Sequence, residues 1–393
     1  MQRNTWEDFW WNNITGPRTF VVSACDALMD NAIAMLIIPP NLPWPNQMQS
    51  AISYELRQKT PSELLIEPLE AKDDCVNDAK IGKLLLSKFA SDSVQNGYRE
   101  KSSITIQAYL LRNKVLQNRI VWVQGLSAAH AKAWLKFCKG YAASAKDGLF
   151  LLEVREPFPT APSKSVRYID YASCVSRHDV QLFNSFILNE KRDQYSDSWS
   201  KYIAAVSANL CEKDAEVSQM LIESVEFSSE EPISGVGRIC EMPDYSQRGR
   251  LAPGYHVLEY YRSNRISELT KRVWEAQVQV VFPLIEMERI KFIEQWRQQI
   301  ETALESNGVY QYGQIIHDPI ELELGTLVYM ISHQSQPGEY CLYLPDESAR
   351  EWLRFLHFCR NQLAHANCCT PKQLNALLDP TGEVRQSLSD KAV

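Results

Sequence analysis

The apolar run Ala32-Ile33-Ala34-Met35-Leu36-Ile37-Ile38, stopped by Pro39-Pro40, is the clearest fold signal in the first part of this chain. A short continuous apolar run that ends at a turn signal is typical of a strand buried on both faces of a sheet. Three more short apolar runs follow, at residues 119–125, 148–154 and 166–171. Together these runs predict four strands.

Helical patterns separate these strands. Residues 20–31, 45–58 and 127–145 are predicted to be helices, whereas residues 104–110 fit a helix or a strand equally well. Strands that alternate with helices are typical of a parallel sheet covered on both faces. Residues 1–175 are therefore predicted to form an α/β domain with a parallel sheet.

The composition is that of a folded chain with more than one domain. At 393 residues the chain is long enough for two or three domains, and its 45% hydrophobic content supplies their cores. The formal net charge of −7 argues against a broadly basic surface, so any nucleic-acid contact should be local. The N-terminus shows no signal-peptide pattern, and no apolar stretch approaches the ~20 residues of a membrane helix. We therefore expect a soluble, cytoplasmic protein without membrane contact.

The ten cysteines are scattered along the chain and form no CxxC pair. Zinc sites and disulfide frameworks usually show a regular cysteine spacing, which is missing here. We expect reduced, mostly buried thiols and no structural metal.

Residues 176–254 are predicted to connect two domains. Residues 178–188 and 197–223 have the apolar spacing of two helices, and residues 225–254 are rich in Ser, Glu, Pro and Gly. Such a composition is typical of a linker, so the main domain boundary is predicted within it.

Residues 255–393 are predicted to form an all-α domain. A first helix over residues 266–282 should kink or end at Pro283, because proline lacks the N–H and clashes with the preceding turn. Apolar residues at helical spacing predict a second helix that reaches Leu304, and a third is predicted over residues 319–332.

The fourth helix of this domain has the clearest pattern. Ser348 and Glu351 fit a capping box, in which the two residues satisfy each other's free backbone N–H groups. Its buried stripe steps by four, three and four residues, through Trp352, Leu356, Cys359 and Leu363. A second set with the same steps lies on another face and comprises Arg354, Phe358, Asn361 and His365. Arg360 lies between the faces, and its long side chain can reach toward Asn361 and His365.

The segment Arg360-Asn361-Gln362-Leu363-Ala364-His365 resembles the motif of the HEPN domain family, in which a late helix of an all-helical domain carries an Arg, a polar residue and a His. Four residues separate the Arg from the His, a common spacing in that family. The resemblance covers residues 255–379. It implies a homodimer whose motif helices face each other, and RNA cleavage without metal or cofactor, in which the RNA 2′-OH attacks the adjacent phosphate.

The resemblance assigns roles to three residues, and their chemistry suits these roles. His365, with an ordinary pKa of about 6.5, can relay a proton at neutral pH. Arg360 can stabilise the negative charge that develops on the phosphate, and Asn361 can orient His365 or hold a phosphate oxygen. Alternatively, His365 is a solvated residue at a helix end, Arg360 pairs with a carboxylate, and the fold serves dimerisation or RNA binding. His357 is expected to pack or to face solvent.

Residues 1–175 resemble, more weakly, a P-loop NTPase of the AAA or STAND type that has lost its catalytic signatures. Gly16-Pro17-Arg18-Thr19 precedes the first helix without the Gly-Lys-Ser/Thr that cradles phosphates, and Arg18 is interpreted as solvated. One strand ends in Gln124-Gly125 where a Walker B acid would hold Mg²⁺. Glu153, near the end of the next strand, is interpreted as a surface residue. We therefore expect a domain that senses a signal or docks a protein partner, without nucleotide hydrolysis.

These features together predict a two-part protein. A degenerate NTPase-like domain senses or docks a partner, and a HEPN-like domain cleaves RNA as a dimer. This combination resembles effectors of prokaryotic defence or conflict systems, such as antiviral or toxin modules. One alternative is a non-enzymatic dimeric scaffold or sensor, and another is a nucleotide-dependent regulator.

Overall fold

The computed structural model describes residues 5–60, 64–71, 75–99, 104–142, 149–155, 158–160, 163–252, 254–336 and 339–379. The chain divides into two compact units, each built from segments that are not continuous in sequence. The first comprises Met1–Phe183, Glu212–Glu216 and Gln247–His256, and the second comprises Asn184–Cys211, Val217–Ser246 and Val257–Val393. No single linker therefore separates the two units.

The first unit is built on a five-stranded parallel sheet, which confirms the predicted α/β class. The strands are β1 (Ile33–Ile38), β2 (Leu65–Glu70), β3 (Arg119–Leu126), β4 (Leu149–Arg155) and β5 (Val166–Asp170), in the order β2-β3-β4-β1-β5. Strand β1 pairs with β4 on one side and β5 on the other, and all its residues are buried. Because neither face of β1 meets water, its sequence is a continuous apolar run.

Strand β2 was not among the predicted strands. Its sequence includes Pro68 between Glu67 and Glu70, and proline in a run argues against a central strand. The structure places β2 at the edge of the sheet, where it pairs with β3 alone. At an edge, a missing N–H and charged side chains are tolerated because one side of the strand has no neighbour.

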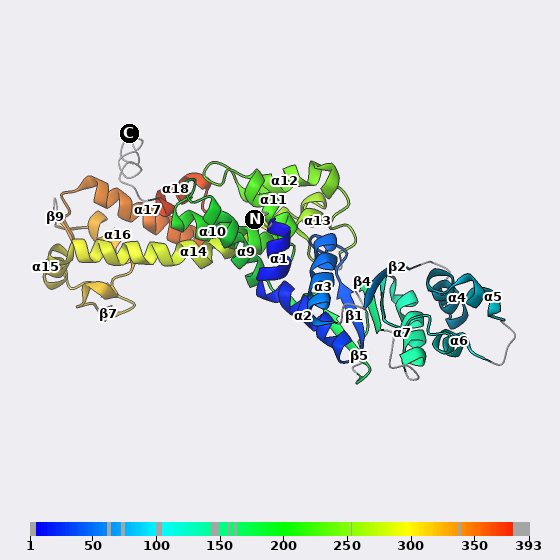
Figure 1. Ribbon diagram of the computed structural model, residues 1–393. Helices are drawn as coiled ribbons and strands as arrows, with labels where there is room; N and C mark the ends of the chain where they lie inside the picture. The colour runs from blue at the N-terminus through cyan, green and yellow to red at the C-terminus, as the bar shows by residue number, and fades with distance from the viewer. Residues whose placement is uncertain are drawn as a thin grey trace. The chain divides into compact units, whose positions relative to one another are not determined.

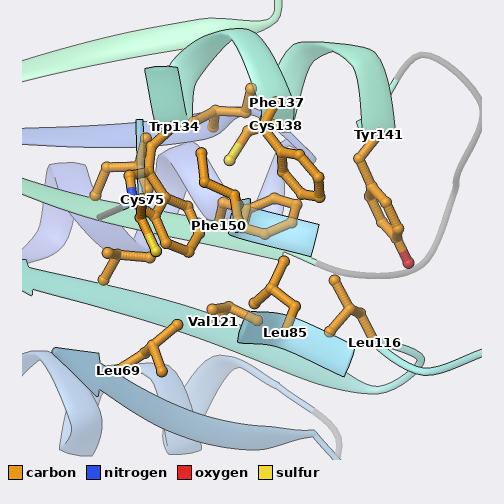
Figure 2. Close-up of a cluster of buried hydrophobic side chains, with 14 of the residues drawn as sticks. Leu69, Cys75, Leu85, Leu116, Val121, Trp134, Phe137, Cys138, Tyr141 and Phe150 are labelled. Carbon is orange, nitrogen blue, oxygen red and sulfur yellow. The ribbon is translucent and has the colours of Figure 1, made fainter. Parts of the chain in front are cut away.

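Helices cover both faces of this sheet (Figure 1). They are α1 (Trp6–Asn13), α2 (Thr15–Met29), α3 (Pro45–Lys59), α4 (Asp78–Phe89), α5 (Asp92–Gly97), α6 (Ile106–Arg112), α7 (Ala128–Ala142) and α8 (Tyr171–Cys174). The core between α4, α6, α7 and the strands includes Trp134, Phe137 and Tyr141, which α7 directs toward the sheet (Figure 2). Segment 104–110, which fitted either element, is helical in α6, where Thr105 caps the first turn. Residues 143–145 and 148, predicted in a helix and a strand, lie outside the described residues.

The second unit is mostly helical. Its longest helix is α14 (Ile266–Gln295), along which α10 (Asp197–Cys211) and α17 (Glu347–Ala364) pack (Figure 1). Its other helices are α12 (Pro232–Glu241), α13 (Val257–Arg262), α15 (Arg297–Asn307), α16 (Leu324–Ser332) and α18 (Pro371–Leu378), with short 3-10 turns η1 (Pro243–Tyr245) and η2 (Pro319–Glu321). Helices α9 (Arg177–Glu190) and α11 (Ala215–Ser224) begin in segments of the first unit and end in segments of the second. Two hairpins interrupt them, formed by β6 (Tyr310–Gln311) with β7 (Gln314–Ile315) and by β8 (Gln334–Gln336) with β9 (Glu339–Tyr340).

Several predicted boundaries in this part of the chain are wrong. The predicted linker, residues 225–254, contains α12 and η1 instead, because packing overrides its Gly and Pro content. The predicted helix over residues 197–223 breaks at Glu212, whose φ is 51°. The helix predicted over residues 266–282 does not end at Pro283, one of the two predicted outcomes, but continues to Gln295. The helix predicted over residues 319–332 is a 3-10 turn followed by α16.

Candidate functional site

Helix α17, which carries the predicted site, begins just before the predicted capping box. Asp346 is its N-cap, and the carboxylate accepts a hydrogen bond from the Ala349 N–H at 3.2 Å. Ser348, the predicted cap, lies inside the first turn. Asp and Ser are comparably good N-caps, so the residue type alone does not choose between the two positions.

An apolar stripe and one hydrogen bond hold α17 against its neighbours. The stripe is buried as predicted and comprises Trp352, Leu353, Leu356, Cys359 and Leu363. The indole N–H of Trp274 on α14 donates to the carbonyl oxygen of Leu363 at 2.7 Å. The helix ends directly afterwards, and Ala366, with a φ of 58°, reverses the chain. These contacts fix the rotation and the end of the helix on which the predicted site lies.

Arg360, Asn361 and His357 form a line of polar contacts on α17. Arg360 Nη1 donates to Asn361 Oδ1 at 3.4 Å, and Asn361 Nδ2 lies 3.0 Å from His357 Nε2. His357 and Asn361 are four residues apart, so they project from successive turns of one face. The amide of Asn361 uses its oxygen toward the guanidinium and its nitrogen toward the imidazole. The structure thus brings together two of the predicted residues and one that was not predicted.

His357 and Arg360 line a cavity of about 360 Å³. The other lining residues are Phe282, Glu286, Arg289, Glu321, Leu322, Glu323, Leu324 and Gly325. Arg289 Nε pairs with Glu286 at 2.8 Å, and its Nη1 donates to the carbonyl oxygens of Ile320 and Leu322 at 3.0 and 2.8 Å. Arg289 is therefore engaged by the wall of the cavity, and Arg360 is the guanidinium that stays available.

The part of α17 that contains Arg360 has a positive charge balance. Within the described ranges, Arg360 makes no ion pair, and its contact with Asn361 is long for a hydrogen bond. From Trp352 to Leu378 the sequence contains no Asp or Glu. The outer side of α17 adds the exposed Arg354. An acidic chain thus has a locally basic segment from Trp352 onward, and guanidinium groups match phosphate oxygens in geometry and charge.

His365 lies apart from the line of polar contacts. It is the C-cap of α17, and its exposed ring makes no hydrogen bond to any residue in the described part of the chain. The predicted contact of His365 with Arg360 and Asn361 is therefore not formed in this structure.

His357 is the residue that the sequence analysis missed. It was expected to pack or to face solvent, but it is half-buried, contacts Asn361 and borders the cavity. Burial and the nearby Arg360 charge lower the pKa of His357 below its ordinary value. The neutral imidazole is therefore favoured at neutral pH, as a proton acceptor requires. The sequence feature that could have identified His357 is its spacing of four residues from Asn361, which places both on one face of a helix.

In the first unit, the Gly16-Pro17-Arg18-Thr19 segment is the first turn of α2. The Gly16 N–H donates to Asp179 Oδ1 at 2.9 Å, and a Cβ at Gly16 would lie 2.7 Å from the other carboxylate oxygen. The start of α2 therefore holds a carboxylate of the protein itself. Arg18 is exposed, as predicted, and donates to the Asn12 carbonyl oxygen at 3.1 Å.

The end of β1 is the other place where a phosphate would be expected, because open parallel sheets bind ligands where the strand order reverses. The chain there reads Pro39-Pro40-Asn41-Leu42-Pro43-Trp44-Pro45, and prolines offer no N–H. The Trp44 N–H donates to Glu216 Oε2 at 3.1 Å. Arg248 pairs with Glu216 at 2.9 Å and with the two oxygens of Asp214 at 2.7 and 2.8 Å. The charged groups at this position satisfy one another, so it does not suit a nucleotide phosphate.

The interpretation of Glu153 as a surface residue is wrong. Glu153 lies in β4 opposite Leu36 of β1, is 9% exposed, and its Oε2 has no hydrogen-bond partner in the part of the chain that the structure describes. Burial raises the pKa of Glu153 and outweighs the opposing effects of Trp122 and Arg155. The sequence pattern did not predict this burial, because a single Glu near a strand end is usually exposed to water.

Among the described residues, no group of three or more His, Cys, Asp or Glu side chains could hold a metal ion. No helix in the described ranges is long and apolar enough to span a membrane. No protein-family model matches this sequence, and a search of curated proteins gives no significant match. The function is therefore inferred from the chemistry of α17.

Proposed function

We propose that the protein is a metal-independent endoribonuclease of the HEPN type, acting as a regulated effector in a prokaryotic defence or conflict system. The observation that carries this proposal is the arrangement on α17. Arg360 lies at a cavity without an ion pair among the described residues and is joined through Asn361 to the imidazole of His357. His365 follows at the exposed end of the same helix.

These groups suit cleavage of RNA by its own 2′-hydroxyl. The 2′-oxygen bonds to the adjacent phosphorus while the bond from phosphorus to the 5′-oxygen breaks, which leaves a 2′,3′-cyclic phosphate and a 5′-hydroxyl. One imidazole takes the proton of the 2′-hydroxyl and another supplies a proton to the 5′-oxygen, roles open to His365 and His357. Arg360 stabilises the charge on the phosphate oxygens.

The phosphate should approach from the outer side of α17, so the long side chain of Arg360 would turn from the cavity toward that side. Glu286, Glu321 and Glu323 line the cavity, so its interior is unfavourable for an anion. The outer side carries Arg354 and His365, both exposed, and no acidic residue between Trp352 and Leu378. A homodimer through this helix would bring two such faces together and raise the local positive charge.

The first unit is proposed to dock a protein partner or sense a signal, without binding a nucleotide. Support comes from Asp179 at the start of α2 and from Glu216 and Arg248 at the end of β1, which fill the two candidate phosphate positions. Nucleotide binding by the wild-type protein, measured by calorimetry, would contradict this part of the proposal.

Cleavage of total RNA and tRNA in EDTA tests the proposed activity. We expect wild-type protein to leave 2′,3′-cyclic phosphate ends, and Arg360→Ala and His365→Ala each to reduce the rate by about 100-fold or more. Arg297→Ala is the control, because Arg297 is exposed on α15 and pairs with Glu301. Unchanged cleavage by both site variants would reject the assignment.

The alternative, a non-enzymatic dimeric scaffold, is favoured by a different observation. Phe358 is 52% exposed on α17 and Tyr329 is 54% exposed on α16, and exposed aromatic side chains are frequent at protein interfaces. Phe358→Asp should then convert a dimer to a monomer in light scattering. If it does so while wild-type protein never cleaves RNA under any condition, the scaffold is the better description.

A further inference from the structure

A second cavity in the helical unit, of about 120 Å³, is not used by the proposed reaction. It lies beside α10, α12, α14 and the turn that leads into α18. Its apolar walls include Phe227, Val273 and Leu374, all buried. A cavity of ~150 Å³ holds benzene, so this one suits a ligand of about five or six non-hydrogen atoms with an apolar body.

One buried hydroxyl oxygen in the lining of this cavity can accept a further hydrogen bond. Tyr202 is 1% exposed, and its hydroxyl oxygen accepts a hydrogen bond from Gln277 Nε2 at 3.4 Å. Gln277 is itself satisfied, because its amide bonds the N–H and the carbonyl oxygen of Cys369 at 2.7 and 3.0 Å. A hydroxyl oxygen has two lone pairs, so the Tyr202 oxygen can accept one further hydrogen bond from a donor inside the cavity.

The charge at the cavity is negative. Glu230 and Glu231 line it, and no Lys or Arg does so among the described residues. Glu230 pairs with Arg238 at 2.6 Å, whereas Glu231 makes no ion pair in the described ranges. Burial, Cys369 and Glu231 together raise the pKa of Cys368, which also lines the cavity, to about 11. Glu231 lines the cavity and is exposed, so its carboxylate lies at the rim.

We propose that this cavity binds a small organic ammonium ion, such as a primary amine with a short apolar stem. The stem would lie against Phe227 and Val273. The ammonium group would meet the carboxylate of Glu231 and the aromatic rings of Tyr202 and Phe227, which attract cations through their faces. A carboxylate ligand of the same size is disfavoured by the two glutamates. This proposal does not depend on RNA cleavage.

Calorimetry on the full chain tests the proposal with three probes that share a four-carbon chain, n-butylammonium, 1-butanol and butyrate. We expect butylammonium to bind with a Kd on the order of millimolar, as so small a ligand allows, and 1-butanol to bind severalfold more weakly. Butyrate should not bind. Glu231→Gln should remove the preference for the amine, whereas Glu241→Gln, on an exposed position of the same helix, should leave it unchanged.

A variant that narrows the cavity completes the test. Ile233→Phe, at its partly exposed rim, should abolish binding of both butylammonium and butanol while the thermal unfolding midpoint stays close to that of the wild type. If amine and alcohol bind with equal affinity and Glu231→Gln changes neither, the cavity is an apolar void without preference for an amine, and the proposal is wrong. Absence of amine binding, or amine binding that survives Ile233→Phe in a folded protein, would overturn the proposal.

Discussion

Asn361 connects two side chains whose chemistry differs, a guanidinium that is always charged and an imidazole whose pKa is lowered by burial and by that charge. The Asn361 oxygen lies 3.4 Å from Arg360 and its nitrogen lies 3.0 Å from His357. This contact orients the His357 ring, and the charge beyond it works against protonation. The Arg360 side chain thus favours the neutral form of His357, which a proton acceptor in the proposed reaction needs.

Arg360→Ala should raise the pKa of His357. Burial and the Arg360 charge both lower it, so removing the charge leaves burial alone. The C–H proton signals of His357, followed by NMR across pH 5 to 8 (roughly the range in which His titrates), report the change. Arg354→Ala is the matched control, because Arg354 is exposed on the same helix and should leave the His357 pKa unchanged. A His357 pKa that is the same in wild type and Arg360→Ala would contradict the arrangement described.

Glu153→Gln should stabilise the protein at neutral pH. Burial raises the folded-state pKa of Glu153, so its contribution to stability is fully present below the unfolded pKa of about 4.3 and is lost as pH rises through the folded pKa. The Gln side chain has nearly the same shape as Glu but no group that titrates. Thermal unfolding should give a higher midpoint than wild type at pH 7.5, with a smaller difference at pH 4. An equal difference at both pH values would show that burial of the charge is not the cause.

At the scale of elements, the sequence pattern of α17 determines which of its faces is buried, but it does not determine where the helix begins. Its apolar stripe follows from the sequence, because residues at helical spacing meet one partner surface. Its first residue does not, because Asp346 and Ser348 are both suitable caps. Helix α14 makes the same point, since it continues through Pro283 although proline removes a backbone donor.

Asp346→Ala should destabilise the second unit by about 1 kcal/mol, because the Ala349 N–H loses its partner. Ser348→Ala should change stability by less than about 0.5 kcal/mol, as for an ordinary exposed position. Denaturant unfolding of the two variants beside wild type measures both effects. The reverse ranking would place the cap at Ser348, where the sequence pattern put it.

At the scale of the whole molecule, segments distant in sequence complete each unit. In the first unit, Arg248 from one segment binds Asp214 and Glu216 from another. Arg248 and His256 hold the pKa of Asp214 below its usual range, although burial alone would raise it. In the second unit, α10 packs along α14, and Asn209 and Arg272 exchange hydrogen bonds to each other's backbone carbonyl oxygens at 3.4 and 3.1 Å.

A fragment of residues 255–393, the predicted all-α domain, should therefore fail to unfold cooperatively. It lacks α10, whose residues from Tyr202 to Cys211 are all buried. A fragment of residues 184–393 contains every segment of the second unit and should show one cooperative thermal transition by circular dichroism. If residues 255–393 alone gave the same transition, α10 would not be part of the core of that unit.

The candidate site was predictable in part. Arg360 and Asn361 are neighbours in sequence, so their proximity needed no tertiary structure. The half-burial of His357 depends on the cavity wall supplied by Phe282, Leu322 and Gly325, which the sequence of α17 does not contain. The exposed ring of His365 likewise depends on where the helix ends, and Trp274 and Ala366 fix that end.

The sequence by itself determined the α/β class of the first unit, the buried strand β1 and the apolar stripe of α17. Each depends on the local periodicity of apolar residues, because the backbone geometry of a strand or a helix places residues of a fixed spacing on the same face. Only the tertiary structure decided the burial of Glu153, the helical character of residues 232–241 and the grouping of distant segments into two units. Those features depend on which surfaces meet, and contacts between residues far apart in the chain leave no local pattern.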